Sequence, residues 1–307
     1  MDHLETLKAF VGVADAKGFA PAARKLQMSP PAVTRAIAAL ERRLGAQLLE
    51  RSTRSVRLTE IGERFLGDCR RILAELDEAE ASAGGAHASL RGELAVTASS
   101  MFGRLHVAPI LLDFLVAYPD VSLRTFFVDR VVHMLDEGFD VAVRIARLPD
   151  SGLTAVRVGS VRRVVIASPA YLAERGTPHA PGDLAAHDAI GFSPSGGSNV
   201  PWSFPAHSSA GADRREIVQP RMRLVANASE LAIEAALHGR GIARALSYQV
   251  DAEVRSGRLV IVLGDHEPEP IPVHLVYMAG RKAPAKVRAL VDFAAERLRR
   301  EPVLRND

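Results

Sequence analysis

The sequence predicts a mixed α/β protein in three parts: a winged helix-turn-helix over residues 1–58, a linker helix with a hinge over residues 59–88, and a two-lobed α/β domain over residues 89–307. Three observations predict this fold class. Two short helical patterns and an arginine-rich hairpin follow one another in residues 18–57. One long apolar stripe at helical spacing runs through residues 59–83, and strand-like and helical runs then alternate along the chain.

A first helix is predicted ahead of the helix-turn-helix. Four apolar residues recur at the i, i+3, i+4, i+7 spacing of one buried helical face: Leu7, Phe10, Val11 and Ala14. We expect Gly18 to end this helix, because glycine readily adopts the left-handed conformation in which many helices end.

The second helix is predicted over residues 22–26. Ala20 occupies the place of its cap, where a Ser or Asp would stabilise the helix by roughly 1 kcal/mol more. Pro21 follows at the first helical position, where its missing N–H costs nothing. A tight break at Gln27 and Met28 separates this helix from the next.

A third, longer helix opens with Ser29, Pro30 and Pro31. Ser29 is a good N-cap, and the two prolines occupy first-turn positions whose amides lack intrahelical partners. Gly45 is expected to end this helix. Four apolar residues are expected to form its buried face: Val33, Ile37, Leu40 and Leu44.

The opposite face of the third helix carries side chains expected to meet DNA. In a helix-turn-helix, the first turns of the second helix of the pair reach base edges in the major groove. Arg35 suits a guanine or a phosphate, and Thr34 suits a base edge or the backbone. The alternative is the solvated face of an ordinary helix, but the preceding helix, the turn and the following hairpin favour DNA binding. The expected contact residues here are Ser29, Pro30, Pro31, Thr34 and Arg35.

An arginine-rich hairpin, the wing, is predicted over residues 48–59. Arg51, Arg54 and Arg57 recur every third residue around a Ser-Thr turn, so they spread along the hairpin. Arg51 and Arg54 are expected to contact phosphates or the minor groove, which positions the protein more than it selects a sequence. Residues 1–60 hold ten Lys and Arg against six Asp and Glu, a net charge of +4, so the rest of the chain, in a total of +3, nets −1. The positive charge is concentrated where DNA binding needs it.

Residues 1–60 resemble the DNA-binding domain of LysR-type transcriptional regulators. The matching residues are spaced along the whole segment: residues 4–10, Phe19, residues 22–24, Ser29, residues 31–35, Ile37, Leu40, Glu41, Leu44, Gly45, Leu48, Leu49, Arg51, residues 58–60 and Gly62. One position departs from the family, whose members often carry glutamine where this chain has Pro30. A proline side chain cannot hydrogen-bond a base, so readout at that position must come from packing or shape.

Thr59 is expected to cap a long helix that runs to about residue 83. Its apolar residues follow spacings of three and four along one face: Ile61, Phe65, Cys69, Ile72, Leu76, Ala79 and Ala83. This stripe must be buried, either against an antiparallel copy from a second subunit or back on its own domain. The resemblance implies the linker helix that forms the dimer. Cys69 is interpreted as a buried small hydrophobe rather than a redox sensor. Some relatives sense oxidants through cysteine pairs in the sensor domain, where this chain has no cysteine.

The composition favours an ordinary globular protein. Of the 307 residues, 48% are hydrophobic and 24% charged. No apolar run approaches 18 residues, so we expect no membrane span, and the acidic start of the chain lacks the order of a signal peptide. A single cysteine rules out an intrachain disulfide framework. We therefore expect a cytoplasmic protein.

After a small-residue hinge at residues 83–86, alternating runs predict an α/β domain with largely parallel sheets. The predicted strands come first: 93–98, 121–128, 141–145 and 161–167, with helices at 106–117, 131–137 and 171–175. A second set of segments follows: 223–226, the helix 230–238, 242–246, 249–255 and 259–263, then strand 273–278 and helix 285–299. The final strand and helix need a partner sheet, which the first set offers.

We therefore expect two lobes. Lobe I spans about 89–164 and 270–300, and lobe II about 165–269, with the chain crossing near residues 164–167 and returning near 263–271. The resemblance implies a periplasmic-binding-protein-like effector domain and thus covers essentially the whole chain. Ligands of two-lobed α/β domains bind in the cleft, at strand C-termini and helix N-termini.

Seven residues are candidates for binding an effector: Ser99, Ser100, Asp129, Arg147, Ser193, Trp202 and Asn227. Ser99 and Ser100 open the helix after the first strand, where free amides suit a carboxylate, and Asn227 holds the matching place in lobe II. Simple helix capping is the alternative for each of them. Asp129 and Arg147 end strands and could face the cleft, whereas Ser193 lies in a glycine- and serine-rich loop over residues 191–204. Trp202 lines a pocket or fills a core, and Arg244 is an alternative anion partner.

These observations predict a sequence-specific DNA-binding transcriptional regulator that a small, anionic organic effector modulates. Its expected partners are double-stranded promoter DNA, the effector, further copies in a homodimer or homotetramer, and RNA polymerase if it activates. A constitutive repressor with a vestigial cleft is the alternative. An enzyme fused to a DNA-binding domain is disfavoured, because the chain has no HExxH, GxSxG or P-loop motif. No catalytic residue, metal, cofactor or membrane partner is predicted.

Overall fold

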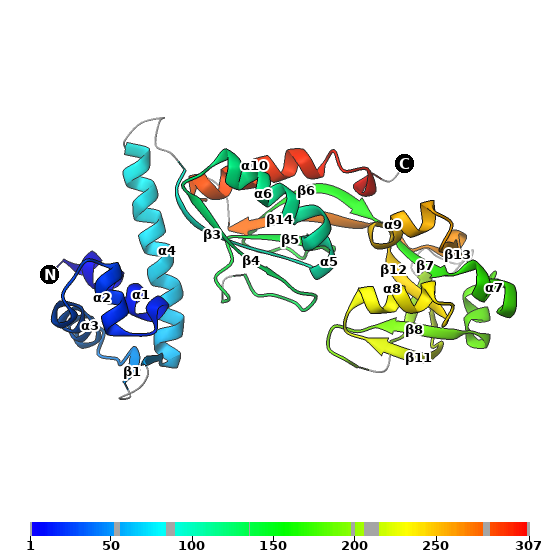
Figure 1. Cartoon of the computed structure of the whole chain (residues 1–307), viewed down its shortest axis with the longest axis horizontal. Helices are drawn as coiled ribbons and strands as arrows, with labels where there is room; N and C mark the ends of the chain where they lie inside the picture. Colours follow the sequence, from blue (N-terminus) through cyan, green and yellow to red (C-terminus); the bar gives the residue numbers. More distant parts are fainter. Residues whose placement is uncertain are drawn as a thin grey trace. The chain divides into compact units, whose positions relative to one another are not determined.

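The computed structural model describes residues 2–51, 56–83, 90–134, 136–197, 200–205, 215–278 and 283–305. The chain forms two compact units, the first holding residues 1–90 and the second most of the remainder (Figure 1). Each unit has its own hydrophobic core.

The first unit begins with helix α1 (His3–Ala16) and helix α2 (Phe19–Lys25). The expectation that Gly18 ends the first helix is wrong. Lys17 takes the left-handed conformation there, with φ 49°, and Gly18 instead precedes α2 as its N-cap. Pro21 is therefore the third helical residue rather than the first, and Ala20 is not the cap. The proline is tolerated because no amide of the first turn has an intrahelical partner.

Helix α3 (Pro30–Leu44) has the predicted ends. The Ser29 hydroxyl accepts a hydrogen bond from the Ala32 amide at 3.3 Å, and Gly45 adopts φ 64°. The break before α3 is also confirmed, since Gln27 has φ 54°. Three of the four expected core residues are buried: Val33, Ile37 and Leu40. Leu44 is 41% exposed, so its assignment to the buried face is wrong.

The wing and the linker helix complete the first unit. Strands β1 (Leu49–Arg51) and β2 (Val56–Leu58) pair antiparallel, as predicted for a hairpin. Helix α4 (Glu60–Ala83) follows, and the Thr59 hydroxyl accepts from the Gly62 amide at 3.0 Å, which confirms the predicted cap. The unit's core joins all four helices and the wing. Its largest fully buried side chains are Phe10, Ile37, Leu40 and Leu48.

The second unit contains two five-stranded sheets, each the centre of one lobe. Lobe I has the strand order β4-β3-β5-β14-β6. Its strands are β3 (Gly92–Ala98), β4 (Val121–Phe127), β5 (Val141–Ile145), β6 (Leu153–Val161) and β14 (Ile271–Met278). β4, β3 and β5 are parallel, whereas β14 runs antiparallel to both β5 and β6.

Lobe II has the strand order β11-β8-β12-β7-β13. Its strands are β7 (Arg163–Ala167), β8 (Asp188–Phe192), β11 (Arg221–Ala226), β12 (Ile242–Leu246) and β13 (Val260–Val262). β7 runs antiparallel to β12 and β13. Both sheets are therefore mixed, and the expectation of largely parallel sheets is wrong. The returning strand β14 and the crossing strand β7 supply the antiparallel pairs.

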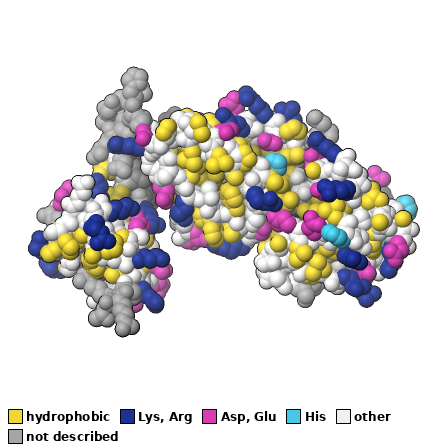
Figure 2. All heavy atoms as spheres, in the orientation of Figure 1, with side chains coloured by type: hydrophobic (Ala, Val, Ile, Leu, Met, Phe, Trp, Pro, Cys, Tyr) yellow, Lys and Arg dark blue, Asp and Glu magenta, His cyan; other side chains and the backbone are white. Residues whose placement is uncertain are grey.

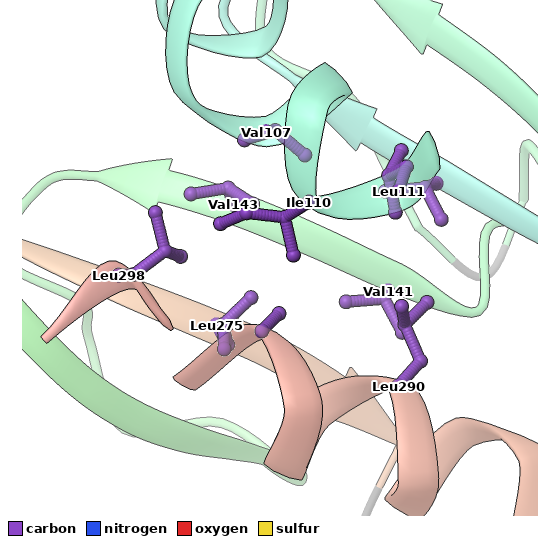
Figure 3. Close-up of a pocket in the computed structure, with 10 residues that line it drawn as sticks. Val107, Ile110, Leu111, Val141, Val143, Leu275, Leu290 and Leu298 are labelled. Atoms are coloured by element: carbon purple, nitrogen blue, oxygen red, sulfur yellow. The ribbon is translucent and has the colours of Figure 1, made fainter. Parts of the chain in front are cut away.

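Helices cover one face of the first sheet. A continuous helical stretch is formed by α5 (Ser100–Phe102), the π-helical turn η1 (Gly103–Val107) and α6 (Ala108–Ala117). It begins six residues before the predicted start. With α10 (Ala285–Leu298) it lines a small pocket whose ten lining residues are all apolar, and Figure 3 shows Val107, Ile110 and Leu111 facing Leu275, Leu290 and Leu298. This pocket belongs to the hydrophobic core of lobe I.

The second sheet is covered on both faces. Helix α8 (Ser229–Leu237) packs on one face with Val164, Ile166, Ala243 and Ala245. The other face carries Val165, Ala167 and Ile242 against a hairpin of β9 (Trp202–Pro205) and β10 (Arg215–Val218). The remaining elements are α7 (Pro169–Arg175), η2 (Pro181–Ala186), α9 (Ser247–Arg255), η3 (Gly264–His266) and η5 (Pro302–Leu304).

Three local expectations differ from the structure. The described residues of the range 131–137 do not form a helix: the amide of Glu137 reaches the carbonyl of His133 in a single turn before Gly138, which has φ 69°. Residues 161–167 are not one strand, because β6 ends at Val161 and β7 begins at Arg163. The chain thus crosses between the lobes at Arg162. Strand β9 lies inside the segment expected to be a loop.

One helical stretch, Ser100–Ala117, is long and apolar enough to span a membrane by length and composition, with a mean hydropathy of 1.4. This differs from the expectation that no segment reaches that length. A core helix of an α/β domain meets the same criterion. Here Phe102, Ile110 and Phe114 of the stretch are buried within the second unit.

Candidate nucleic-acid interface and effector site

The first turns of α3 present an exposed surface for DNA. Ser29, Pro30, Pro31, Thr34 and Arg35 are all exposed. The Thr34 hydroxyl donates to the Pro30 carbonyl at 3.0 Å, so it offers an outside group its oxygen lone pairs and its methyl group. Arg35 has no carboxylate partner among the described residues, and its guanidinium is free to donate to a base edge or a phosphate.

The two prolines give this surface a rigid apolar part. Pro30 and Pro31 occupy the first two positions of α3, where the ring fixes φ near the helical value. An apolar side chain at a base edge can contact a thymine methyl but cannot donate or accept a hydrogen bond. Hydrogen-bonded readout by this turn therefore falls to Arg35 and to the Thr34 oxygen.

The wing is fixed to α3 by a residue that the sequence did not single out for this role. The Glu41 carboxylate accepts from the amides of Leu48 and Leu49 at 2.9 and 3.2 Å. It thereby sets where the hairpin leaves the helix. Glu41 lies in the last turn of α3, where a negative charge interacts unfavourably with the helix dipole. An acidic residue at such a position indicates that its side chain has a specific hydrogen-bond partner.

Of the wing arginines, Arg51 is the last residue of β1, in register with Val56, and Arg57 on β2 is exposed. Arg54 lies outside the described residues. Figure 2 shows Lys and Arg side chains distributed over the visible face of the first unit, consistent with the concentration of positive charge in residues 1–60.

The apolar stripe of α4 is divided between two environments. Cys69 is fully buried and Phe65 packs against Phe10, with ring centroids 5.8 Å apart, so this part of the stripe packs back on its own domain. Ile61 and Ile72 are 48% and 41% exposed. Burial raises the pKa of the Cys69 thiol to about 12, with the Asp68 charge adding to the effect. Its interpretation as a buried small hydrophobe is confirmed.

In lobe I, the structure brings three of the predicted effector residues together. Asp129 lies beside the start of α5, and its carboxylate accepts from the Ser100 amide at 3.0 Å. The amide expected to hold an effector carboxylate is therefore occupied by the chain's own carboxylate. The Ser99 hydroxyl is buried close to the phenol of Tyr248, and it partly offsets the rise that burial causes in the pKa of that phenol.

The two lobes touch through a cluster of aromatic rings that sequence reasoning missed. Tyr248 of α9 lies edge-on to Phe102 at 5.1 Å and to His106 at 5.6 Å between ring centroids. Burial is the main cause that raises the pKa of Tyr248 to about 12, and the charges of Asp129 and Glu230 raise it further. Nothing in the local sequence marks this tyrosine.

Polar contacts also join the lobes beside this cluster. Arg104 and Glu230 form an ion pair at 3.3 Å, and the Ser229 hydroxyl lies 3.8 Å from the sulfur of Met101. The helix N-termini that were expected to flank a ligand thus contact each other directly.

The other candidate residues have separate roles. Arg147 is exposed and forms an ion pair with Glu269. Ser193 begins a turn, with its amide bonded to the Ala226 carbonyl at 2.8 Å, and Asn227 is exposed. Trp202 is 1% exposed and fills the core of lobe II, so of the two alternatives for this residue the structure selects the core. Among the described residues, no cluster of three or more His, Cys, Asp or Glu could hold a metal ion.

Comparisons with known proteins cover both units. The family described as "LysR substrate binding domain" matches residues 87–299, and the family "Bacterial regulatory helix-turn-helix protein, lysR family" matches residues 4–63. An HTH-type transcriptional repressor of Pseudomonas aeruginosa is 32% identical over 302 residues, which cover 98% of this chain and 94% of that protein.

Two solved structures resemble the chain over nearly its whole length. One is CrgA, a LysR-type transcriptional regulator from Neisseria meningitidis, with a TM-score of 0.59 and 30% identity over 96% of this chain and 98% of that one. The other is the Vibrio cholerae virulence activator AphB, with a TM-score of 0.59 and 26% identity over 96% of this chain and 99% of that one.

Proposed function

Because the chain belongs to the LysR family of transcriptional regulators, we propose that it recognises a specific promoter sequence in double-stranded DNA through α3 and the wing. The observation that carries this proposal is the exposed first turn of α3, with Arg35 unpaired among the described residues and Thr34 beside it. The wing arginines add phosphate contacts that set the register of α3 in the groove.

Regulation is proposed to come from a small organic anion that binds the second unit. A ligand shifts a conformational equilibrium only if it binds the two states unequally, and the direct contacts between the lobes are the interactions that such a ligand would make or break. Binding that opens or tightens the Arg104–Glu230 contact would change the angle between the lobes. In a homodimer or homotetramer this change would alter the spacing of the DNA-binding units.

The DNA-binding proposal is tested by selecting bound duplexes from a random pool with the full chain, followed by gel shifts on the enriched sequence. Arg35→Ala should weaken binding to the selected sequence by about tenfold to a hundredfold, because one base contact typically provides 1–3 kcal/mol of discrimination. Binding to unrelated DNA should fall far less.

Arg43→Ala provides the matched control. Arg43 is an exposed arginine in the last turn of the same helix, far from the turns that reach base edges. Its removal should leave the preference for the selected sequence intact. Equal loss of preference in both variants, or DNA binding that does not weaken with rising salt, would refute the proposed interface.

A constitutive repressor with an empty cleft is the second candidate, favoured by one observation. Asp129 occupies the Ser100 amide, so this donor is not open to a ligand. A thermal-shift screen of small organic acids separates the two functions. A rise in the melting temperature with any of these acids supports the regulated form. An unchanged melting temperature with all of them supports the constitutive one.

A further inference from the structure

Arg244, on β12 of lobe II, is a half-buried cation with no carboxylate beside it in the part of the chain that the structure describes. Its guanidinium lies 5.6 Å from the ring centroid of Trp202 and 5.5 Å from that of Phe204. Both rings are buried in the core of the lobe, at 1% and 2% exposure. No acidic side chain of the described residues pairs with Arg244 or contributes to its pKa.

A second arginine lies on the same face of the sheet. In the antiparallel pairing of β12 with β7, Arg244 is opposite Val165 and Leu246 is opposite Arg163. Arg163 is two residues from Val165 and therefore points to the same side as Arg244, at a diagonal spacing of roughly 7–8 Å between Cα atoms. Val165 packs with Trp202 and Phe204, which identifies this side as the one covered by the hairpin.

The half-buried Arg244 and the exposed Arg163 repel each other, and among the described residues no anion lies between them to offset this. Burial, and after it the charge of Arg163, lowers the pKa of Arg244 to about 10, so the Arg244 guanidinium remains charged at neutral pH. The arginines nearby differ, since Arg162 pairs with Glu267 at 3.0 Å and Arg223 pairs with Asp188 at 3.3 Å. A half-buried charge gains most when an anion completes its hydrogen bonds.

The pair also lies at the edge of the sheet where ligands bind in α/β proteins. Arg244 is two residues from the end of β12, and Arg163 is the first residue of the antiparallel β7, so both lie at one edge. The parallel strands β8 and β11 end at this same edge. In open α/β sheets the carboxyl ends of the parallel strands form the ligand site.

We propose that Arg244 and Arg163 bind an oxyanion, a carboxylate or phosphate group, of the effector. The rings of Trp202 and Phe204 hold the Arg244 guanidinium from below by cation–π contact, which leaves its N–H groups to form paired hydrogen bonds with two oxygens. This inference rests on the proposed function, whose anionic effector it assigns to lobe II rather than to the start of α5.

The chain carries its own reporter for the test. Trp202 is its single tryptophan and lies against Arg244, so its fluorescence responds to a group that binds there. The full chain is titrated with sodium malonate and, separately, with inorganic phosphate, each against sodium chloride at equal ionic strength. We expect one or both oxyanions to change Trp202 fluorescence to saturation and chloride to leave it unchanged. The anion that saturates at lower concentration identifies the carboxylate or the phosphate as the preferred group.

Three variants locate the site. Arg244→Gln and Arg163→Gln should each weaken the binding of the oxyanion by about tenfold or more, as expected when hydrogen bonds to a charged group are lost. The Arg163→Gln variant keeps Arg244 and its contacts with the two rings. It therefore remains informative if Arg244→Gln folds poorly. Arg240→Gln removes an exposed arginine of the same lobe and should bind like the original chain.

Absence of a saturable response to both anions would overturn the inference, as would equal binding by Arg163→Gln and the original chain. Gel shifts on the same preparations keep the two proposals apart. Retained DNA binding without an oxyanion response rejects this site alone, whereas lost DNA binding with an intact response rejects the DNA interface.

Discussion

Gly62 lies where the first turn of α4 passes the wing. A Cβ atom at this position would overlap the carbonyl oxygen of Leu48, which is backbone and cannot move aside like a side chain. That carbonyl also accepts a hydrogen bond from the Thr59 amide at 3.0 Å. Gly62 is therefore required because the backbone of α4 passes so close to the backbone of Leu48 that no side chain fits between them.

Replacing Gly62 with alanine should destabilise the first unit by about 2 kcal/mol, in the range of overpacked cores. Gly67→Ala is the matched control, because the same change five residues later in α4 meets no atom within 4 Å. That change should stabilise the helix by about 0.5–1 kcal/mol, since alanine is the better helix former. Chemical denaturation of both variants gives the two free energies, and a Gly62→Ala variant as stable as Gly67→Ala would contradict the packing described here.

Cys69 is predicted to be unreactive in the native chain. Its thiol is buried, and a pKa raised to about 12 leaves almost no thiolate near pH 8. Labelling with a thiol reagent should therefore be slow in the native state and rapid, at one thiol per chain, in denaturant. Rapid native labelling would show that α4 separates from its core.

At the scale of elements, α4 combines a docked stretch with an exposed one. Phe65 and Cys69 attach it to the first unit, whereas Ile61 and Ile72 remain about half exposed. Two isoleucines eleven residues apart recur after three helical turns and so lie on one face. We expect this face to form the contact with a second copy.

The substitution Ile72→Glu tests that contact. It should shift the full chain toward monomers in light scattering, because a charge inside an apolar helix interface is costly. Melting of the monomer should change little, since Ile72 is already exposed in the single chain. The control is Arg70→Ala, in the same helix as Ile72. It removes an exposed ion-pair partner of Asp15 in α1 and should leave the assembly state unaltered.

For the whole chain, one buried and two partly buried histidines make stability depend on pH. The pKa values of His106, His187 and His274 are all lowered, with burial as the largest cause for each. A histidine whose folded pKa lies below its unfolded value binds protons more weakly when folded. The stabilisation is therefore fully present above the unfolded value of about pH 6.5 and is lost as the pH falls from there through the lowered folded pKa values.

We expect the melting temperature of the second unit to fall between pH 7.5 and 5.5, a window in which most carboxylates stay ionised. His274→Gln should reduce the slope of this decline. His3→Gln alters an exposed histidine of the first unit and should leave the slope as it is. A melting temperature that rises on acidification would contradict the burial of these side chains.

Local signals were enough to predict the elements of the first unit. The ends of α3 follow from Ser29 and Gly45, and the start of α4 follows from Thr59, because caps act within one helical turn. The same reasoning misplaced the start of α2, where proline fits several first-turn positions. It also predicted a helix at residues 131–137, where the chain makes a single turn.

The second unit was harder to predict because its contacts are distant in sequence. Strand β9 exists through pairing with β10 across an intervening segment, and its own composition resembles a loop. Asp129 reaches the Ser100 amide across 29 residues, and Arg147 pairs with Glu269 across 122. Spacing rules carry no information about such pairs. The sequence therefore placed Ser99, Asp129 and Arg147 beside strand ends but did not reveal the partners of Asp129 and Arg147.

The hydrogen bond from the Ser100 amide to Asp129 has a consequence for selectivity. A carboxylate tethered to the chain competes for that donor at an effective concentration on the order of millimolar. A free carboxylate of equal intrinsic affinity that is present below that level is therefore outcompeted for the Ser100 amide. The tethered carboxylate thus sets a concentration threshold. An incoming acid displaces it from this amide only when the acid is abundant, and a scarcer acid must bind elsewhere.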